Sequence, residues 1–313
     1  MASNNHSSVT EFILQSFSEN PQVQILILSL FLGLFAVAFT GNSLIITVIS
    51  LHPGLHSPMY FFLINLALLD VLSTSTVLPK MLNNLTTKNT ISYGGCLAQI
   101  YFLSWFLAAE ALLFTAMAYD RYAAICQPFH YTTIMSKAAC SFIASTVWGI
   151  SGINTTVHII MTAHLSFCGP NVIDHFFCEI PLLLPLSCSS TYVNNAMVVV
   201  ADMFFAIFNF LLILVSYGFI ISSILKIRTK EGKKRAFSTC SSHLIVVSLY
   251  YCTIIYIYIL PGLGQSLKKG KVASVFYTIV TPALNPLIYS LRNKDVKIAL
   301  NKLYLLLRKQ LDI

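Results

Sequence analysis

The chain has few charged residues. Only 10% of its 313 residues are Asp, Glu, Lys or Arg, whereas an ordinary soluble domain carries roughly 25%. Hydrophobic residues make up 56% of the chain, and the mean hydropathy is +0.76. This balance excludes an ordinary soluble domain and indicates that lipid is the main solvent. Met1–Asn20 also lacks a basic leader and a small-residue cleavage site. We therefore expect no removable signal peptide and an uncleaved first span.

Basic residues are missing from the beginning of the chain, where none precedes Lys80. They gather instead in the segment 226–235 and in the tail after residue 291. Because Lys and Arg accumulate in cytoplasmic loops, we expect the N-terminus outside and the tail in the cytoplasm. The net charge of +8 then mostly reflects the basic residues expected on the cytoplasmic side of the membrane. We interpret them as a solvated rim at the lipid surface and not as a nucleic-acid-binding site.

Apolar runs long enough to cross a bilayer, about 20 residues each, predict an all-α membrane protein with a seven-helix bundle. The expected spans are 24–50, 57–80, 96–120, 138–162, 196–225, 237–260 and 271–291. Residues 1–23 form the expected extracellular N-terminus, 24–291 the seven-helix transmembrane domain with a long outer loop at 163–195, and 292–313 the cytoplasmic tail. Apolar residues at helical spacing in the tail predict an amphipathic helix on the inner leaflet. They are Val296, Leu300, Leu303 and Leu307.

Internal repeats and catalytic clusters are lacking as well. A transporter would show repeats or broken helices in matching halves, and the sequence has neither. An intramembrane enzyme would need a nucleophile with its base, or a metal cluster, on facing spans. No such set is found, so we expect a protein that is not an enzyme.

Cysteines cluster on the outer side of the predicted bundle. Cys168, Cys178 and Cys188 lie in the long loop, and Cys96 opens the third span. Four thiols in an oxidising compartment predict two disulfides, for which the residues leave three pairings open. Asn5 begins a glycosylation sequon on the same side.

Six motifs occur in order along nearly the whole chain. They are Gly41–Asn42, Leu55–Leu63 with Asp70 after it, Met117–Cys126, Ser216–Tyr217, Arg235–Leu244 and Pro282–Asn293. With them the chain resembles the rhodopsin-like (class A) G-protein-coupled receptors and, within these, the odorant receptors. Pro128–Tyr131 and the short N-terminus are similar to the tetrapod-type (class II) members.

The resemblance implies a function and an activation switch. A small, mostly apolar odorant would bind in the outer half of the bundle and activate a stimulatory, olfactory-type G protein at the plasma membrane, which raises cyclic AMP. The alternative is the same receptor fold sensing a metabolite outside the nose. Arg121 would pair with Asp120 at rest and swing toward Tyr217 and Tyr289 on activation. The remaining expected switch residues are Tyr122, His243, Asn285 and Pro286.

Three further sets of residues follow from the resemblance. The disulfides would be Cys96–Cys178 and Cys168–Cys188. Asp70 and Glu110, ionisable at membrane depth, would lie near Asn285 and hold either Na⁺ or a shared proton; no other cofactor is expected. Pro282 and Pro286 would break backbone hydrogen bonds in span seven, with Asn285 placed to take these up.

The ligand is expected among apolar residues and a few hydroxyls in the outer half of the bundle. For Asp202 two interpretations stay open, namely contact with a polar or amine ligand and a place near the outer membrane interface. The candidate ligand-binding residues are Leu103, Ser104, Leu107, Ala108, Asp202, Phe205, Ile255, Tyr258, Val275 and Thr278.

Overall fold

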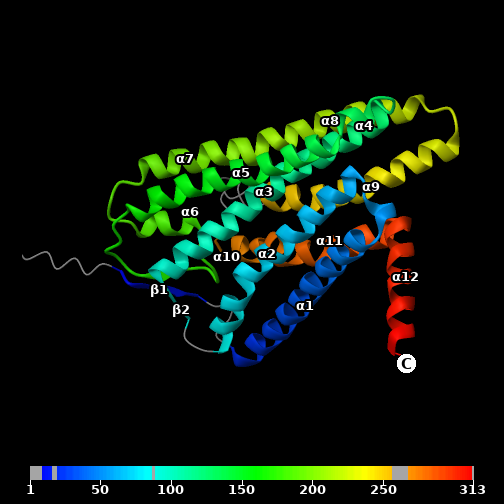
Figure 1. The fold of residues 1–313 in the computed structure, drawn as a ribbon. Coiled ribbons are helices and arrows are strands. Elements are labelled where there is room, and N and C mark those ends of the chain that lie inside the picture. The colour runs from blue at the N-terminus through cyan, green and yellow to red at the C-terminus, as the bar shows by residue number, and fades with distance from the viewer. Residues whose placement is uncertain (1–8, 16–19, 87–88, 256–266, 312–313) are drawn as a thin grey trace, which may run out of the picture.

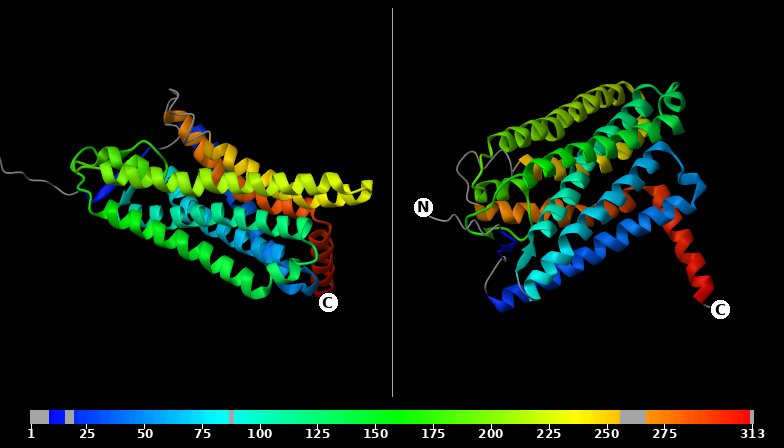
Figure 2. Two further views of the ribbon diagram at one scale, coloured as in Figure 1. Left: turned by 90° about the horizontal axis from the view of Figure 1, so that it is seen from above. Right: turned by 60° about the vertical axis from the view of Figure 1, so that its left-hand side comes forward.

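Long helices lie side by side in an elongated bundle in the computed structural model of the chain (Figure 1). The structure describes residues 9–15, 20–86, 89–255 and 267–311. Asn5 and Tyr258 lie outside these residues. A small β-sheet lies at one end of the bundle and helix α12 at the other (Figure 2). We call these the sheet end and the α12 end.

The first half of the bundle consists of four long helices, and three of them begin at a polar residue whose side chain caps the first turn. Asn20 accepts a hydrogen bond from Gln22 N at 2.9 Å, and Ser92 and Ser136 cap the third and fourth helices in the same way. Such caps satisfy backbone N–H groups that have no partner inside the helix. The helices are α1 (Pro21–Leu51), α2 (Pro58–Thr86), α3 (Tyr93–Cys126) and α5 (Lys137–Ala163), with a single turn, α4 (Tyr131–Ile134), between the last two.

The second half contains two spans with a wide turn in each. The fifth span is made of α7 (Tyr192–Asp202), a π-helical turn (Met203–Phe208) and α8 (Asn209–Lys226). The sixth is α9 (Lys230–Ile254), and the seventh is made of α10 (Leu267–Val275), a π-helical turn (Phe276–Val280) and α11 (Thr281–Arg292).

The described helices have the length and composition of a membrane bundle, which confirms the predicted fold class. Five are long and apolar enough to cross a bilayer, and a shorter apolar stretch, Cys240–Ile254, belongs to α9. The five are Pro21–Leu51, Pro58–Asn84, Tyr93–Cys126, Tyr192–Lys226 and Gly270–Ser290.

Three short strands cover the sheet end. β1 (Glu11–Leu14) pairs with β2 (Thr90–Ser92) antiparallel and with β3 (Val172–Ile173) in parallel. Phe12 and Leu14 point inward from β1 and are buried. The sequence did not predict this sheet, because strands of two to four residues are too short for a period-two pattern to be recognised.

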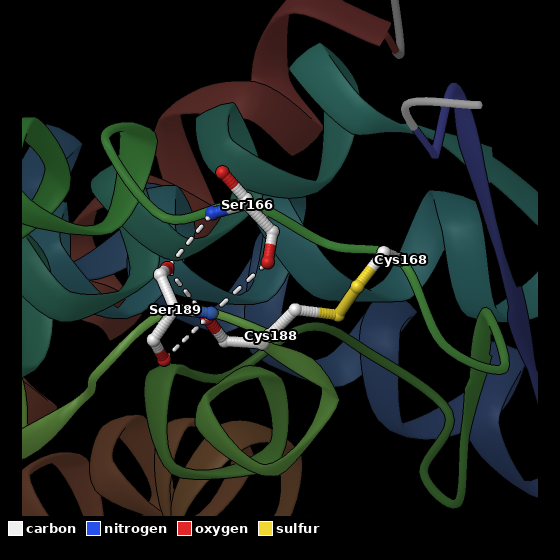
Figure 3. The surroundings of a disulfide bond; sticks show 5 residues. Ser166, Cys168, Cys188 and Ser189 are labelled. Carbon is white, nitrogen blue, oxygen red and sulfur yellow. Dashed lines mark hydrogen bonds between the residues drawn. A yellow bond between two sulfur atoms is a disulfide. The ribbon is translucent and has the colours of Figure 1, made fainter. Parts of the chain in front are cut away.

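The long loop is folded and cross-linked. It contains β3 and the short helix α6 (Ile180–Leu183). The disulfide Cys96–Cys178 ties the loop to α3, and Cys168–Cys188 closes it on itself (Figure 3). Beside the second disulfide, Cys188 N donates to the carbonyl of Ser166 at 2.8 Å. Of the three pairings that four cysteines allow, the structure has the one that the resemblance implies.

Helix α12 (Lys294–Leu311) turns away from α11 and crosses the end of the bundle (Figure 1). Val296 is buried against the core, whereas Ile298, Tyr304 and Leu305 on other faces are exposed. The amphipathic helix expected after the last span is therefore present. The described side chains do not include that of Leu307.

A proline break in α11 fixes how closely α1 approaches it. Pro286 has no N–H to donate, and the side chain of Asn42 in α1 donates to the carbonyl of Pro282 at 2.9 Å instead. Asn285 donates to Asp70, so the expectation that Asn285 takes up the released carbonyl is wrong. A Cβ atom at Gly41 would come within 2.8 Å of Pro286 Cγ. Only glycine fits at this crossing without a shift of one helix.

We expect Gly41→Ala to lower the melting temperature of the purified chain, because overpacking a helix contact costs on the order of 1–3 kcal/mol. Gly33→Ala is the matched control, since Gly33 lies in the same helix and a Cβ atom there would meet nothing within 4 Å. Thermal unfolding of both variants in detergent measures the difference. Equal melting temperatures for the two variants would contradict the close crossing of α1 and α11.

Candidate functional site

A cavity of about 560 Å³ opens between the helices in the half of the bundle nearer the sheet end. The folded loop closes it with Cys178, Glu179, Ile180 and Pro181. Most lining side chains are apolar, as is usual for sites that hold small organic molecules. The helices contribute Leu103, Ser104, Leu107, Ala108, Ala111, Asn154, Thr155, His158, Val198, Val199, Ala201, Asp202, Met203, Phe205, Ala206, Ile207, Phe210, Tyr250, Tyr251, Ile254, Ile255 and Tyr277.

The structure brings most of the predicted ligand-binding residues to this cavity, but not the two in span seven. Val275 and Thr278 do not line it; Tyr277 does. A π-helical turn, Phe276–Val280, interrupts the regular helix of span seven here and contains Tyr277. Thr278 is fully buried and donates to the carbonyl of Ser274 at 2.6 Å. The predicted residues on the cavity wall are Leu103, Ser104, Leu107, Ala108, Asp202, Phe205 and Ile255.

Polar contacts hold the loop over the cavity from two sides. On the α3 side, the backbone N–H of Cys178 donates to Gln99 Oε1 at 2.9 Å. On the other side, His175 Nε2 and Ser274 Oγ lie 2.9 Å apart in a hydrogen bond, and Asp174 forms a 2.5 Å ion pair with Lys271. Burial, assisted by the charge of Lys271, lowers the pKa of His175 to about 3. His175 is therefore neutral at physiological pH, and sequence analysis missed its part in seating the loop.

Glu179 is the carboxylate of the loop that reaches the cavity. It is half-buried, and Tyr277 OH donates a hydrogen bond to it. Burial raises the pKa of Glu179 to about 7; the hydrogen bond from Tyr277 opposes the shift, and the charge of Asp202 adds to it. Small changes in its surroundings thus decide whether this side chain carries a charge near neutral pH. No sequence pattern predicts this contact, since it joins residues 98 positions apart.

A second polar cluster lies deeper in the bundle. Asp70 and Glu110 are both buried and interact electrostatically, and Asn285 Nδ2 donates to Asp70 Oδ2 at 2.9 Å. Among the described residues, Glu110 Oε1, Asn285 Oδ1 and Tyr289 OH have no hydrogen-bond partner although all three are buried. Oxygen atoms left without donors are what a small hard cation or a shared proton needs. The residues present therefore fit the predicted ion site.

A buried ion pair lies toward the α12 end of α3. Arg121 Nε donates to Asp120 Oδ2 at 2.9 Å, and both residues are less than 10% exposed. Tyr131 OH of α4 donates to the other carboxylate oxygen, Oδ1, at 2.8 Å. Asp120 is thus satisfied on both oxygens, which offsets part of the cost of burying the pair. Burial and the negative charge of Asp120 raise the pKa of Tyr131, so its proton stays in place.

The remaining predicted switch residues lie on α3, α8, α9 and α11. Tyr217 OH of α8 and His243 Nδ1 of α9 form a 2.7 Å hydrogen bond, which joins spans five and six. Tyr289 is buried in α11. Tyr122 packs edge-on against Phe219 of α8 at 6.0 Å between ring centroids. Pro286 packs at the crossing of α1 and α11 instead of contacting the ion pair.

Known proteins with similar sequences are numerous. The olfactory receptor family matches residues 31–308. Olfactory receptor 13A1 of Homo sapiens is 56% identical over 301 residues, which cover 96% of this chain and 92% of that protein. Olfactory receptor 13G1 of Homo sapiens is 50% identical over 97% of this chain and 99% of that protein, and olfactory receptor 5B21 of Mus musculus is 46% identical over 96% and 94%. The chain therefore belongs to the olfactory receptor family, whose members are seven-helix, multi-pass membrane receptors and not enzymes.

Proposed function

We propose that this receptor binds a small, mostly apolar odorant in the cavity under the folded loop and activates a stimulatory, olfactory-type G protein, which raises cyclic AMP. The observation that carries the proposal is a mainly apolar cavity near one end of a bundle whose other end holds a buried ion pair. Burial of a ligand of this kind supplies about 25 cal/mol per Å² of apolar surface. One or two hydrogen bonds to the cavity wall set its orientation.

The proposed switch is an exchange of partners by Arg121. At rest its guanidinium is held by Asp120, and Tyr217 is held by His243. When α9 moves outward, the Tyr217–His243 bond breaks and Arg121 turns toward Tyr217 and Tyr289. The cleft that opens at the α12 end receives the G protein. A ligand drives this change only by binding the active arrangement more tightly than the resting one.

The membrane orientation completes the proposal. The sheet end, with both disulfides, faces the outside, where thiols are oxidised. The α12 end faces the cytoplasm, together with the basic residues of the segment 226–235, where α8 ends and α9 begins. Asn5 would carry a glycan on the outer side. The receptor resides in the plasma membrane.

We further propose that the Asp70–Glu110 cluster holds Na⁺ in the resting state. A bound cation would neutralise the charge of the two buried carboxylates, and it would take as ligands the buried oxygen atoms that lack hydrogen-bond donors. Asp70, Glu110 and Asn285 would hold it. A shared proton is the competing occupant, and salt dependence separates the two.

Cyclic AMP in cells that express the receptor with an olfactory-type G protein is expected to rise with the dose of at least one volatile in a diverse panel. Arg121→Ala should reduce that response at least about tenfold. The variant cannot form the contacts with Tyr217 and Tyr289 that stabilise the active arrangement, so the ligand shifts a smaller fraction of the receptor into it. Lys302→Ala, an exposed cation on α12, serves as the control. Silence of the native receptor across the panel, with surface expression proven, would contradict the proposed function.

The melting temperature of the purified receptor is expected to be higher in NaCl than in N-methylglucamine chloride of the same ionic strength. The reason is that an ion bound only by the folded state stabilises that state by mass action. Asp70→Asn should remove the difference between the two salts. Equal melting temperatures of the native receptor in both salts would show that the cluster holds a proton and not Na⁺.

A further inference from the structure

Two carboxylates of the odorant cavity come from different elements. Glu179 enters from the folded loop and Asp202 from the end of α7, and both line the cavity. They are close enough for the charge of Asp202 to act on Glu179. Among the described lining residues none is Lys or Arg. In a receptor whose net charge is +8, the cavity thus has the opposite sign, and nothing on its described wall compensates for it.

Like charges brought together in a mostly apolar cavity repel each other unless a proton or a cation is shared. Lys271 does not supply the positive charge, because it is bound to Asp174 of the loop and does not line the cavity. Tyr277 donates to Glu179 but carries no charge at neutral pH. The cavity wall therefore favours a ligand that brings the positive charge with it.

Other polar atoms on the wall also lack partners. Thr155 and His158, one turn apart on α5, both line the cavity and are more than nine-tenths buried. Among the described residues, neither Thr155 Oγ1 nor His158 Nε2 has a hydrogen-bond partner. The same is true of the hydroxyl of Tyr251, which also lines the cavity. Buried polar atoms are costly without a partner, so these three atoms point to a ligand with polar groups of its own.

We propose that the ligand of this receptor is a small protonated amine, whose ammonium group lies between Glu179 and Asp202 and whose apolar part fills the remaining cavity. The inference rests on the proposed function and narrows it to one chemical class. Hydrogen bonds from a charged donor to a carboxylate are shorter and about twice as strong as those between neutral groups. Thr155 and His158 supply hydrogen-bonding positions for a second polar group on the ligand.

The experiment compares straight-chain alkylamines of four to eight carbons with the alcohols of the same length, with cyclic AMP as the readout. The amines are expected to activate the receptor at concentrations at least about tenfold lower than the alcohols, a difference of about 1.4 kcal/mol. Glu179→Gln and Asp202→Asn should each abolish most of this preference, measured as the ratio of amine to alcohol potency in the same variant. Glutamine keeps an acceptor for Tyr277, so the loop contact survives. Glu11→Gln is the matched control, because Glu11 is an exposed residue of β1 and does not line the cavity.

The dependence on external pH gives a second readout. Burial raises the pKa of Glu179 to about 7, so lowering the pH from about 8 to about 6 protonates it, whereas an alkylamine, with a pKa near that of Lys at about 10.4, stays charged. Amine potency should therefore fall as the pH decreases, and alcohol potency should not. The titratable groups that face Glu179 are Tyr277, Asp202 and His158; His175 on the same loop stays neutral in this range.

Each outcome decides the proposal. An amine preference that both cavity variants remove, and that Glu11→Gln keeps, supports it. Amines no more potent than alcohols, or an amine preference that survives in both variants, would overturn it. Silence to both series at proven surface expression would also overturn it. A response to other volatiles in the same cells would then leave the proposed odorant function standing, and silence to every compound would count against both.

Discussion

Lipid offers no hydrogen-bond partner to a polar group, and the bundle is arranged around that constraint. Several buried polar side chains in the spans meet a partner across the bundle or line the internal cavity. Asn42 of α1 takes up the carbonyl that Pro286 leaves without a donor, and Asn285 is thereby available to Asp70. Asp120 receives both Arg121 and Tyr131. These contacts stabilise the fold, and the one between Asp120 and Arg121 is also part of the proposed switch.

The two ends of the bundle differ in how firmly they are held. Two disulfides, a three-stranded sheet and the Asp174–Lys271 ion pair fix the loop over the cavity. At the α12 end, spans five and six are joined through the hydrogen bond between Tyr217 and His243. A preformed site at one end and a few exchangeable contacts at the other are what a ligand-driven population shift requires. The charge within the cavity then determines which ligands drive it.

The sequence predicted the bundle and seven residues of the cavity wall, because long apolar runs and ordered motifs carry that information locally. It failed where distant residues decide the geometry. In span seven Tyr277, and neither Val275 nor Thr278, lies on the cavity wall, and no residue pattern in the sequence marks the π-helical turn that contains Tyr277. The partner of the Pro282 carbonyl is 240 positions away in the chain. The sheet formed by β1 is equally non-local, since it joins three segments that are each too short to be recognised.

The proposed switch requires that a ligand in the outer cavity separate α9 from the rest of the bundle at the α12 end. A distance between spin labels at Thr133 of α4 and Lys234 of α9, both at that end, measures this directly in a variant whose four free cysteines are serine. We expect the distance between the two labels to increase by several ångströms when an activating ligand and a nucleotide-free G protein are added to the receptor in lipid discs. A distance that stays the same under those conditions would contradict the proposed switch.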